Sequence, residues 1–160
     1  MSALSPPLAD TATPALVPAS SAMLDQLTKV YELMETCPQT LLVTEHLIHG
    51  GMYARTIRRE FDSVTIGSLI NRATILIVNG SCSMLIGDRR VELTGYNVLA
   101  GLPGRKSFSW AHGPVEMTMI FPTSAQTVEE AENEVFAEAD CLLSRRISAG
   151  NSRVLVAMIT

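Results

Sequence analysis

The side chains that could bind a transition metal are few in this sequence. The histidines are His46, His49 and His112, and the cysteines form no Cys-x-x-Cys pair. His46 and His49 lie three residues apart, which on a β-strand puts their side chains on opposite faces. That geometry is poor for one shared ion, although a site built from all three histidines is an alternative. We therefore predict no metal site and no cofactor.

Acidic side chains and nucleophile motifs also give no catalytic pattern. Glu45 and Glu116 fall on expected strands and Glu60 directly follows one, but no spacing makes two of them an acid–base pair. The sequence contains no phosphate-binding loop, no Gly-x-Ser-x-Gly elbow and no dinucleotide fingerprint. We therefore predict no catalytic residues and no enzymatic activity.

The cysteines are three in number, Cys37, Cys82 and Cys141. An odd count without a paired motif argues against a disulfide framework and against a zinc knuckle. We predict reduced thiols that serve as inert packing residues.

These side chains must be positioned by a β-rich central region. Turn signals recur at Gly50-Gly51, Asn79-Gly80, Gly87-Asp88 and His112-Gly113-Pro114. Many short strands at hairpin spacing predict a sandwich or a closed barrel, because closure removes exposed sheet edges. Six apolar side chains are expected to be buried: Ile75, Ile77, Met84, Ile86, Val98 and Met119. The expected strands cover residues 41–48, 52–59, 64–69, 74–78, 82–86, 90–93, 96–99, 107–111 and 115–121.

Two helices are expected to flank this region. The first covers about 21–36, with Ser20 or Ser21 as its cap and Pro38 after its end. The second covers about 128–145 and starts with a capping box formed by Thr127 and Glu130. Its charged side is predicted to be a solvated face, formed by Glu129, Glu130, Glu132, Glu134 and Glu138.

Composition limits the class of protein. The chain has 160 residues, a formal net charge of −4 and a sequence pI of about 5.3. One domain with arms fits this length. No basic surplus supports nucleic-acid binding, and no apolar run approaches the ~20 residues of a membrane helix. We therefore expect no nucleic-acid partner and no association with a membrane. Because the sequence shows no signal-peptide pattern, we also expect a cytoplasmic location.

The ends of the chain differ from its centre. Residues 1–20 form an extended arm rich in Pro, Ala and Ser, and residues 21–145 form the domain with its flanking helices. Residues 146–160 end in an apolar, β-prone segment. This segment is either a strand added to the chain's own barrel or a strand donated to a neighbour, and the sequence does not choose between them.

Several stretches resemble small cupin proteins encoded by bacteriophages. They are Gly51-Met52-Tyr53-Ala54-Arg55, the segment around Ile75–Gly80, the run from Leu93 to Lys106, and the ending Met119–Thr123 before an acidic helix. The resemblance covers residues 43–138. It implies a mainly β fold, a single cupin-type antiparallel barrel or jelly roll with a central cavity and an N-terminal and a C-terminal flanking helix.

The resemblance also shows which ligands are missing. Gly80 matches the turn glycine of the first metal motif of the family, and the first histidine position falls on Asn71. Gly104 matches the glycine of the second motif, and its histidine position falls on Ser107. Neither an amide nor a hydroxyl replaces imidazole well at a transition metal. The resemblance therefore implies a metal-free barrel, with a cavity expected to be lined by Asn71, Arg72, Tyr96 and Ser107.

Three functions are compatible with these features. The first is a non-enzymatic phage structural or assembly protein that acts in the host cytoplasm and becomes part of the virion. It would form a homo-oligomer or bind other virion proteins through its two arms. The second is a phage cupin that binds a small ligand or a host protein through the barrel cavity. The third is a metal-dependent cupin enzyme with an unrecognised site.

Overall fold

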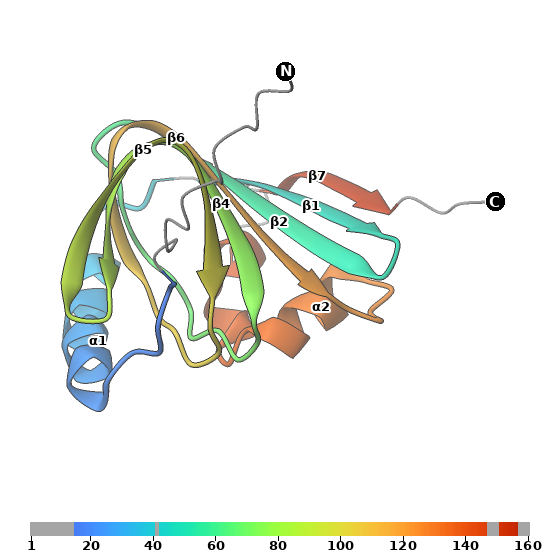
Figure 1. The fold of residues 1–160 in the computed structure, drawn as a ribbon, viewed down its shortest axis with the longest axis horizontal. Helices are drawn as coiled ribbons and strands as arrows, with labels where there is room; N and C mark the ends of the chain where they lie inside the picture. Colours follow the sequence, from blue (N-terminus) through green and yellow to red (C-terminus); the bar gives the residue numbers. More distant parts are fainter. Residues whose placement is uncertain (1–14, 41, 147–150, 157–160) are drawn as a thin grey trace, which may run out of the picture.

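The computed structural model describes residues 15–40 and 42–146, together with the backbone of 151–156. The fold is mainly β, with helices near both ends of the chain (Figure 1). Its elements are α1 (Ser21–Glu35), β1 (Val43–His49), β2 (Met52–Arg59), β3 (Val64–Ile66), β4 (Thr74–Ile86), β5 (Arg89–Gly101), β6 (Phe108–Pro122), α2 (Val128–Val135), the 3-10 turn η1 (Ala139–Cys141), α3 (Leu143–Arg146) and β7 (Asn151–Val156).

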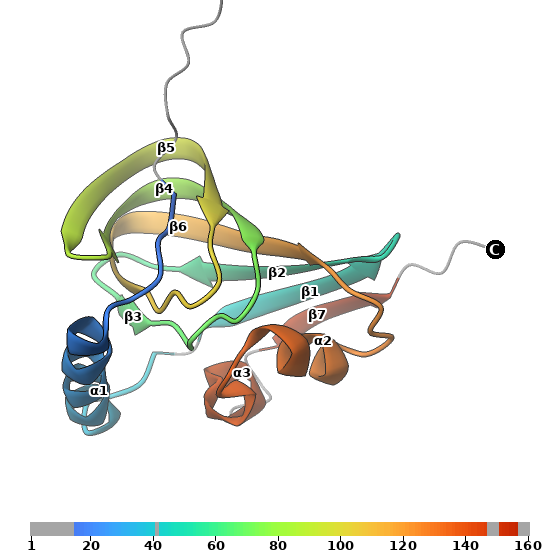
Figure 2. The same cartoon turned by 60° about the horizontal axis from the view of Figure 1, so that its bottom comes forward.

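The strands form one strongly curved sheet in the order β5-β4-β6-β2-β1-β7, with β3 paired to β6 beside this path. All pairs are antiparallel except β1 with β7. Figure 2 shows β4, β5 and β6 curving over one side of the molecule, while α1 and the α2–α3 segment lie under the other. This arrangement confirms the expected single antiparallel jelly roll with flanking helices. The sheet is not closed, because β5 and β7 end the strand order.

The strands β4, β5 and β6 are longer than the sequence predicts, and β5 joins the two strands expected at 90–93 and 96–99. β4 continues through Asn79-Gly80, so the hairpin turn predicted there is wrong, and β6 continues in the same way through His112-Gly113-Pro114. Gly80 pairs with Gly95 on β5, and the register with β6 shifts between Gly80 and Cys82. An extra residue of this kind bends a strand without reversing it. The expected turns at Gly50-Gly51 and Gly87-Asp88 are confirmed.

The register decides which apolar side chains point inward. Val78, Cys82 and Met84 of β4 are buried, whereas Ile75 keeps 48% and Val98 keeps 47% of its surface exposed. Ile75 and Val98 were expected to be buried, and that prediction is wrong because both stand on the outer face of the sheet. Ile77 and Ile86 are half-buried, whereas Met84 and Met119 are buried as expected.

The first helix agrees with the sequence. The Ser20 side chain accepts a hydrogen bond from the backbone N–H of Met23, and Met23 and Leu27 are the buried residues of α1. The capping box of Thr127 and Glu130 is also present at the start of α2. No helix in the part of the chain that the structure describes is both long and apolar enough to span a membrane.

The second helix is shorter than predicted. α2 ends at Val135, and Phe136 takes an extended conformation and bridges to Ile70. A 3-10 turn and α3 then fill the rest of the range expected to be helical. The helix α2 thus stops before Phe136 because this residue pairs with the segment at Ile70.

Glu132 departs from the solvated face predicted for α2. It is 2% exposed and lies between two arginines. Its Oε1 is 3.4 Å from Nε of Arg55 on β2, and its Oε2 accepts from Nε of Arg145 at 2.8 Å. The prediction is wrong because Glu132 faces the sheet, where these two guanidinium groups make its burial tolerable.

The two ends of the described chain meet opposite edges of the sheet. Leu16 exchanges backbone hydrogen bonds with Ala100 and Leu102 beside β5. β7 runs parallel to β1 of the same chain, which is one of the two arrangements expected for the C-terminal segment. Residues 1–14, which make up most of the expected N-terminal arm, lie outside the described residues.

Candidate ligand-binding cavity

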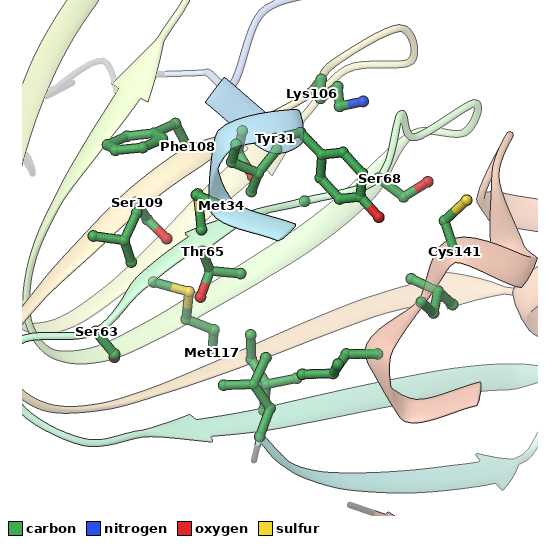
Figure 3. Close-up of a pocket in the computed structure, with 18 of the residues that line it drawn as sticks. Tyr31, Met34, Ser63, Thr65, Ser68, Lys106, Phe108, Ser109, Met117 and Cys141 are labelled. Atoms are coloured by element: carbon green, nitrogen blue, oxygen red, sulfur yellow. The ribbon is translucent and has the colours of Figure 1, made fainter. Parts of the chain in front are cut away.

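A cavity of about 1070 Å³ lies between the inner face of the sheet, α1 and the segment from η1 to α3. Figure 3 shows Tyr31 and Met34 projecting into it from α1, with Cys141 on the opposite side. The strands that border it are β1, β2, β3, β4 and β6. The cavity therefore occupies the space enclosed by the curved sheet.

The sheet side of the cavity is largely apolar. Met84, Met117 and Met119 point inward from β4 and β6 and are buried, and Leu76 lies with them. Methionine side chains are flexible and polarizable, so they adapt to apolar ligands of different shape. This wall is suited to a hydrocarbon surface.

Hydroxyl groups form a second part of the wall. They come from β3, β6 and the adjoining loops, and Figure 3 labels Ser63, Thr65, Ser68 and Ser109 among them. The Oγ atom of Ser68 is inaccessible to solvent and has no hydrogen-bond partner among the described residues. The hydroxyl residues of this wall are Ser63, Thr65, Ser68, Ser107 and Ser109.

Arg59 lies behind this hydroxyl wall and is 3% exposed. Its guanidinium donates to Oγ of Ser109 at 2.6 Å, to the carbonyl of Ser109 at 3.2 Å, and to both Oγ and the carbonyl of Ser63. Burial lowers the pKa of Arg59 to about 10. These neutral acceptors hold β2, β3 and β6 together, which is a structural task.

Arg105 is a second buried guanidinium, 4% exposed, and it lines the cavity. Its Nη2 donates to Oγ1 of Thr74 at 2.5 Å and its Nη1 donates to the carbonyl of Leu102 at 3.3 Å. No carboxylate pairs with Arg105 in the described ranges, and burial lowers its pKa to about 10. The cavity wall thus carries a positive charge held by neutral acceptors.

The cavity mouth is bridged by polar contacts between α1 and α3. Glu35 accepts from the hydroxyl of Tyr31 and from Nη1 of Arg146, each at 2.8 Å. These bonds lower the pKa of Glu35, and burial together with Glu35 raises the pKa of Tyr31. Exposed pairs of this kind add little stability, so these contacts hold α1 only weakly against α3.

The cysteines do not all behave as packing residues. Cys82 is buried in the sheet, and burial raises the pKa of its thiol. Cys37 and Cys141 are exposed and line the cavity mouth, so the packing role predicted for them is wrong. Cys37 follows the last turn of α1 and Cys141 is the last residue of η1, and side chains at such ends are less enclosed.

The residues of the cavity do not fit a transition metal. In the described part of the chain, no group of three His, Cys, Asp or Glu side chains could hold an ion. His46 is buried and its Nδ1 is 2.7 Å from the hydroxyl of Tyr53, whereas His49 is exposed. The thiols and carboxylates that line the cavity thus do not gather into a ligand set, and its guanidinium groups cannot act as ligands.

The structure places one of the four expected lining residues in the cavity. Ser107 belongs to its wall. Tyr96 stands on the outer face of β5, opposite Asn79, with 68% of its surface exposed. Arg72 is exposed and pairs with Glu134 at 3.3 Å, and Asn71 is exposed beside it. These three lie outside because the strand register and the loop before β4 turn them to the surface.

A polar cluster that joins the buried Ser83 to the half-buried His112 and the exposed Glu92 was not anticipated. Ser83 contacts Nε2 of His112, and Glu92 lies 3.4 Å from the same nitrogen. Nucleophilic catalysis needs a base whose second nitrogen is oriented by another group, and here both partners approach one nitrogen. Residues 83, 92 and 112 are brought together by strand pairing, which no local motif signals.

Comparisons with known proteins find remote likeness in fold. No family model matches the chain, and no curated protein matches it. Solved structures with a similar fold include a cupin superfamily protein from Desulfitobacterium hafniense, at 12% identity and a TM-score of 0.44, over 55% of this chain and 83% of that one.

Two further solved structures are similar to the same degree. A cupin-2 domain protein from Shewanella frigidimarina has 13% identity and a TM-score of 0.42, over 61% of this chain and 98% of the other. A cupin 2 conserved barrel domain protein from Salinispora arenicola has 12% identity and a TM-score of 0.45, over 54% and 82%. Likeness at this level carries no argument about ligand or reaction.

Proposed function

We propose that this chain is a non-catalytic binding protein that holds an apolar small molecule inside a metal-free cupin-type sheet. The observation that carries the proposal is the cavity of about 1070 Å³ with methionines on its sheet wall and a few convergent polar groups. Small-molecule sites typically have this size, this apolar lining and this small number of polar contacts.

The chemistry of the wall supports binding over turnover. Hydroxyl, thioether and guanidinium groups face the cavity, and the carboxylates that line it are all on exposed residues, namely Glu32, Glu35, Asp62 and Glu138. The buried carboxylate of Glu132 is engaged by Arg55 and Arg145. A general base or acid must lie within hydrogen-bond reach of the substrate with a suitable pKa. The buried residues of the cavity wall supply no such pair, so the proposal assigns them to recognition.

A neutral probe tests this proposal. The fluorescent amine N-phenyl-1-naphthylamine should bind the purified chain with a blue-shifted emission, and 1-dodecanol should displace it. Met117→Trp fills the cavity and should weaken probe binding at least tenfold. Met52→Trp, at a half-exposed position outside the cavity, should leave binding unchanged.

Two results would contradict the proposal. One is that the wild-type chain does not bind the probe. The other is that Met117→Trp and Met84→Phe, which both add volume at the sheet wall, bind the probe as well as Met52→Trp does. Cooperative thermal unfolding of each variant checks that it has folded.

An assembly function in a bacteriophage is a second proposal, in which the chain is a virion component that associates with further copies of itself. The sequence resemblance to phage cupins supports it. So does the apolar outer face of β4 and β5, where Ile77 pairs with Val98 and where Ile75, Tyr96 and Val98 are exposed. Contiguous apolar surface of this kind commonly marks an interface.

Light scattering and mass spectrometry test the assembly proposal. The wild-type chain should be an oligomer at micromolar concentration, and Val98→Asp should reduce its mass. Leu33→Asp, which changes an exposed side chain on α1, should not. The second proposal would be contradicted if the wild-type chain is a monomer by light scattering. It would also be contradicted if mass spectrometry does not find the chain in purified virions.

A further inference from the structure

We infer that the ligand of the cavity is an amphipathic anion, an apolar chain that ends in a single carboxylate, and that Arg105 binds the carboxylate. This inference rests on the proposed binding function and names the ligand class. It follows from the charges that the fold buries, from the bonds that Arg105 leaves open, and from the apolar wall that shares the cavity with it.

The buried charges do not balance. The charged side chains that are buried in the described residues are Arg59, Arg105 and Glu132. Glu132 is already bound by Arg55 and Arg145, which are themselves mostly covered. One buried carboxylate therefore serves two arginines on the α2 side, and none serves Arg59 or Arg105.

Arg59 and Arg105 differ in how their donors are used. Arg59 makes four hydrogen bonds with Ser63 and Ser109, and it does not line the cavity. Arg105 makes two, with Thr74 and Leu102, and it does line the cavity. A guanidinium has five N–H donors, so Arg105 retains donor capacity for a ligand.

A buried guanidinium stays charged and is costly without a counter-charge. A carboxylate in the cavity would supply that charge and would accept two parallel N–H bonds, which is the geometry that arginine favours. The unpartnered hydroxyl of Ser68 in the same wall is a further donor for a polar head group. The other basic residues of the cavity wall, Arg55, Lys106 and Arg146, each pair with a carboxylate. The guanidinium of Arg105, which has no such partner among the described residues, matches one negative charge better than the two of a phosphate monoester.

The remainder of the ligand is defined by the sheet wall. Met84, Met117 and Met119 offer a surface that favours hydrocarbon. The mouth lies under α1, where Tyr31 and Met34 face inward (Figure 3). An unbranched chain with one acidic end would satisfy both the charged and the apolar part of the cavity, whereas a sugar or a nucleotide would leave the methionines facing polar groups.

The test compares dodecanoate with 1-dodecanol, which share a chain and differ in the head group. Both are titrated below their aggregation limits at pH 7.4 by displacement of N-phenyl-1-naphthylamine. The wild-type chain should bind dodecanoate at least tenfold more tightly than the alcohol. Arg105→Met should bring this ratio near one, because it weakens the binding of dodecanoate far more than the binding of the alcohol. Arg72→Met, at the exposed arginine outside the cavity, should keep the wild-type ratio.

The outcomes separate the two proposals. If neither ligand binds, the proposed function fails and the inference fails with it. If acid and alcohol bind equally, the binding function stands and the anion inference is overturned. If the acid binds more tightly but Arg105→Met keeps the preference for the acid, another side chain binds the carboxylate and the inference is overturned. Only the loss of the preference in Arg105→Met supports it.

A measurement on the unaltered chain covers the case in which Arg105→Met does not fold. The Nε–H resonance of Arg105 in a ¹⁵N NMR spectrum, assigned with the help of Arg105→Lys, should shift on addition of dodecanoate and stay in place on addition of 1-dodecanol. An equal response to both compounds, or no response to either while both bind, would overturn the role of Arg105.

Discussion

A β-carbon on Gly101 would lie 2.6 Å from Cζ of Arg105, so the guanidinium packs directly against the backbone at the end of β5. The same β-carbon would lie 2.7 Å from Oγ1 of Thr74, the hydroxyl that accepts a hydrogen bond from Arg105. The position of the Arg105 guanidinium therefore requires that the residue four positions earlier, Gly101, has no side chain.

Gly101→Ala should destabilise the chain and displace Arg105. Both neighbours are buried side chains, so the cost of the overlap should be about 1–3 kcal/mol. Urea unfolding measures the change, and the preference for dodecanoate should fall in parallel. Gly113→Ala is the control, because a β-carbon there meets nothing within 4 Å. Equal stabilities for the two variants would argue against this packing.

Gly80→Ala should be more damaging than Gly95→Ala, although the two glycines face each other in the same bend. Gly80 has φ +133°, and a β-carbon on it would lie 2.3 Å from the carbonyl oxygen of Pro114. Gly95 has φ +69° and open space, so only the left-handed backbone costs energy, about 1–2 kcal/mol. Thermal melts of the two variants should rank in this order.

Glu132→Gln should lower the free energy of unfolding by about 3–5 kcal/mol, because it leaves Arg55 and Arg145 without their shared carboxylate. Chemical denaturation measures this loss. Glu129→Gln, on the exposed side of the same helix, should change stability by less than about 0.5 kcal/mol. If both substitutions are equally mild, Glu132 does not anchor α2 to the sheet.

The capping box at α2 should give a pH dependence. Backbone N–H groups of Gln126 and Thr127 lower the pKa of Glu130 below its ordinary value of 4.5. The folded chain thus releases this proton more readily than the unfolded chain, so the stabilisation is present above pH 4.5 and is lost as the pH falls through the lowered pKa. The difference in urea midpoint between wild type and Glu130→Gln should be larger at pH 7 than at pH 3. A difference independent of pH would contradict the assignment.

Features that depend only on neighbouring residues, such as helix caps and a tight hairpin turn, were predicted correctly from the sequence in most cases. The Ser20 cap, the capping box and the hairpin at Gly50-Gly51 depend on neighbouring residues, and each is present. The Asn79-Gly80 pair carries the same local signal as a hairpin turn. It lies in a bend because a third strand, β6, pairs with β4 on both sides of it. Pairing with distant strands decided that outcome.

The cavity could be predicted only in part. Ser107 was found because a family motif points to its position, whereas Tyr96 pairs with Asn79 and stands on the outer face of the sheet. Glu132 was expected on a solvated face, and no sequence pattern singled out Arg105. Their burial arises from Thr74 and Arg55, which are distant in sequence, and no spacing rule connects such pairs.

The parallel pairing of β1 with β7 has a consequence for how the chain folds during synthesis. β1 leaves the ribosome long before β7, and until then one of its edges carries unpaired N–H and C=O groups. Contacts between distant segments form slowly because a long loop must close first. We therefore expect the nascent chain to pass through an interval with an open sheet edge, in which a chaperone or a second nascent chain could pair with β1.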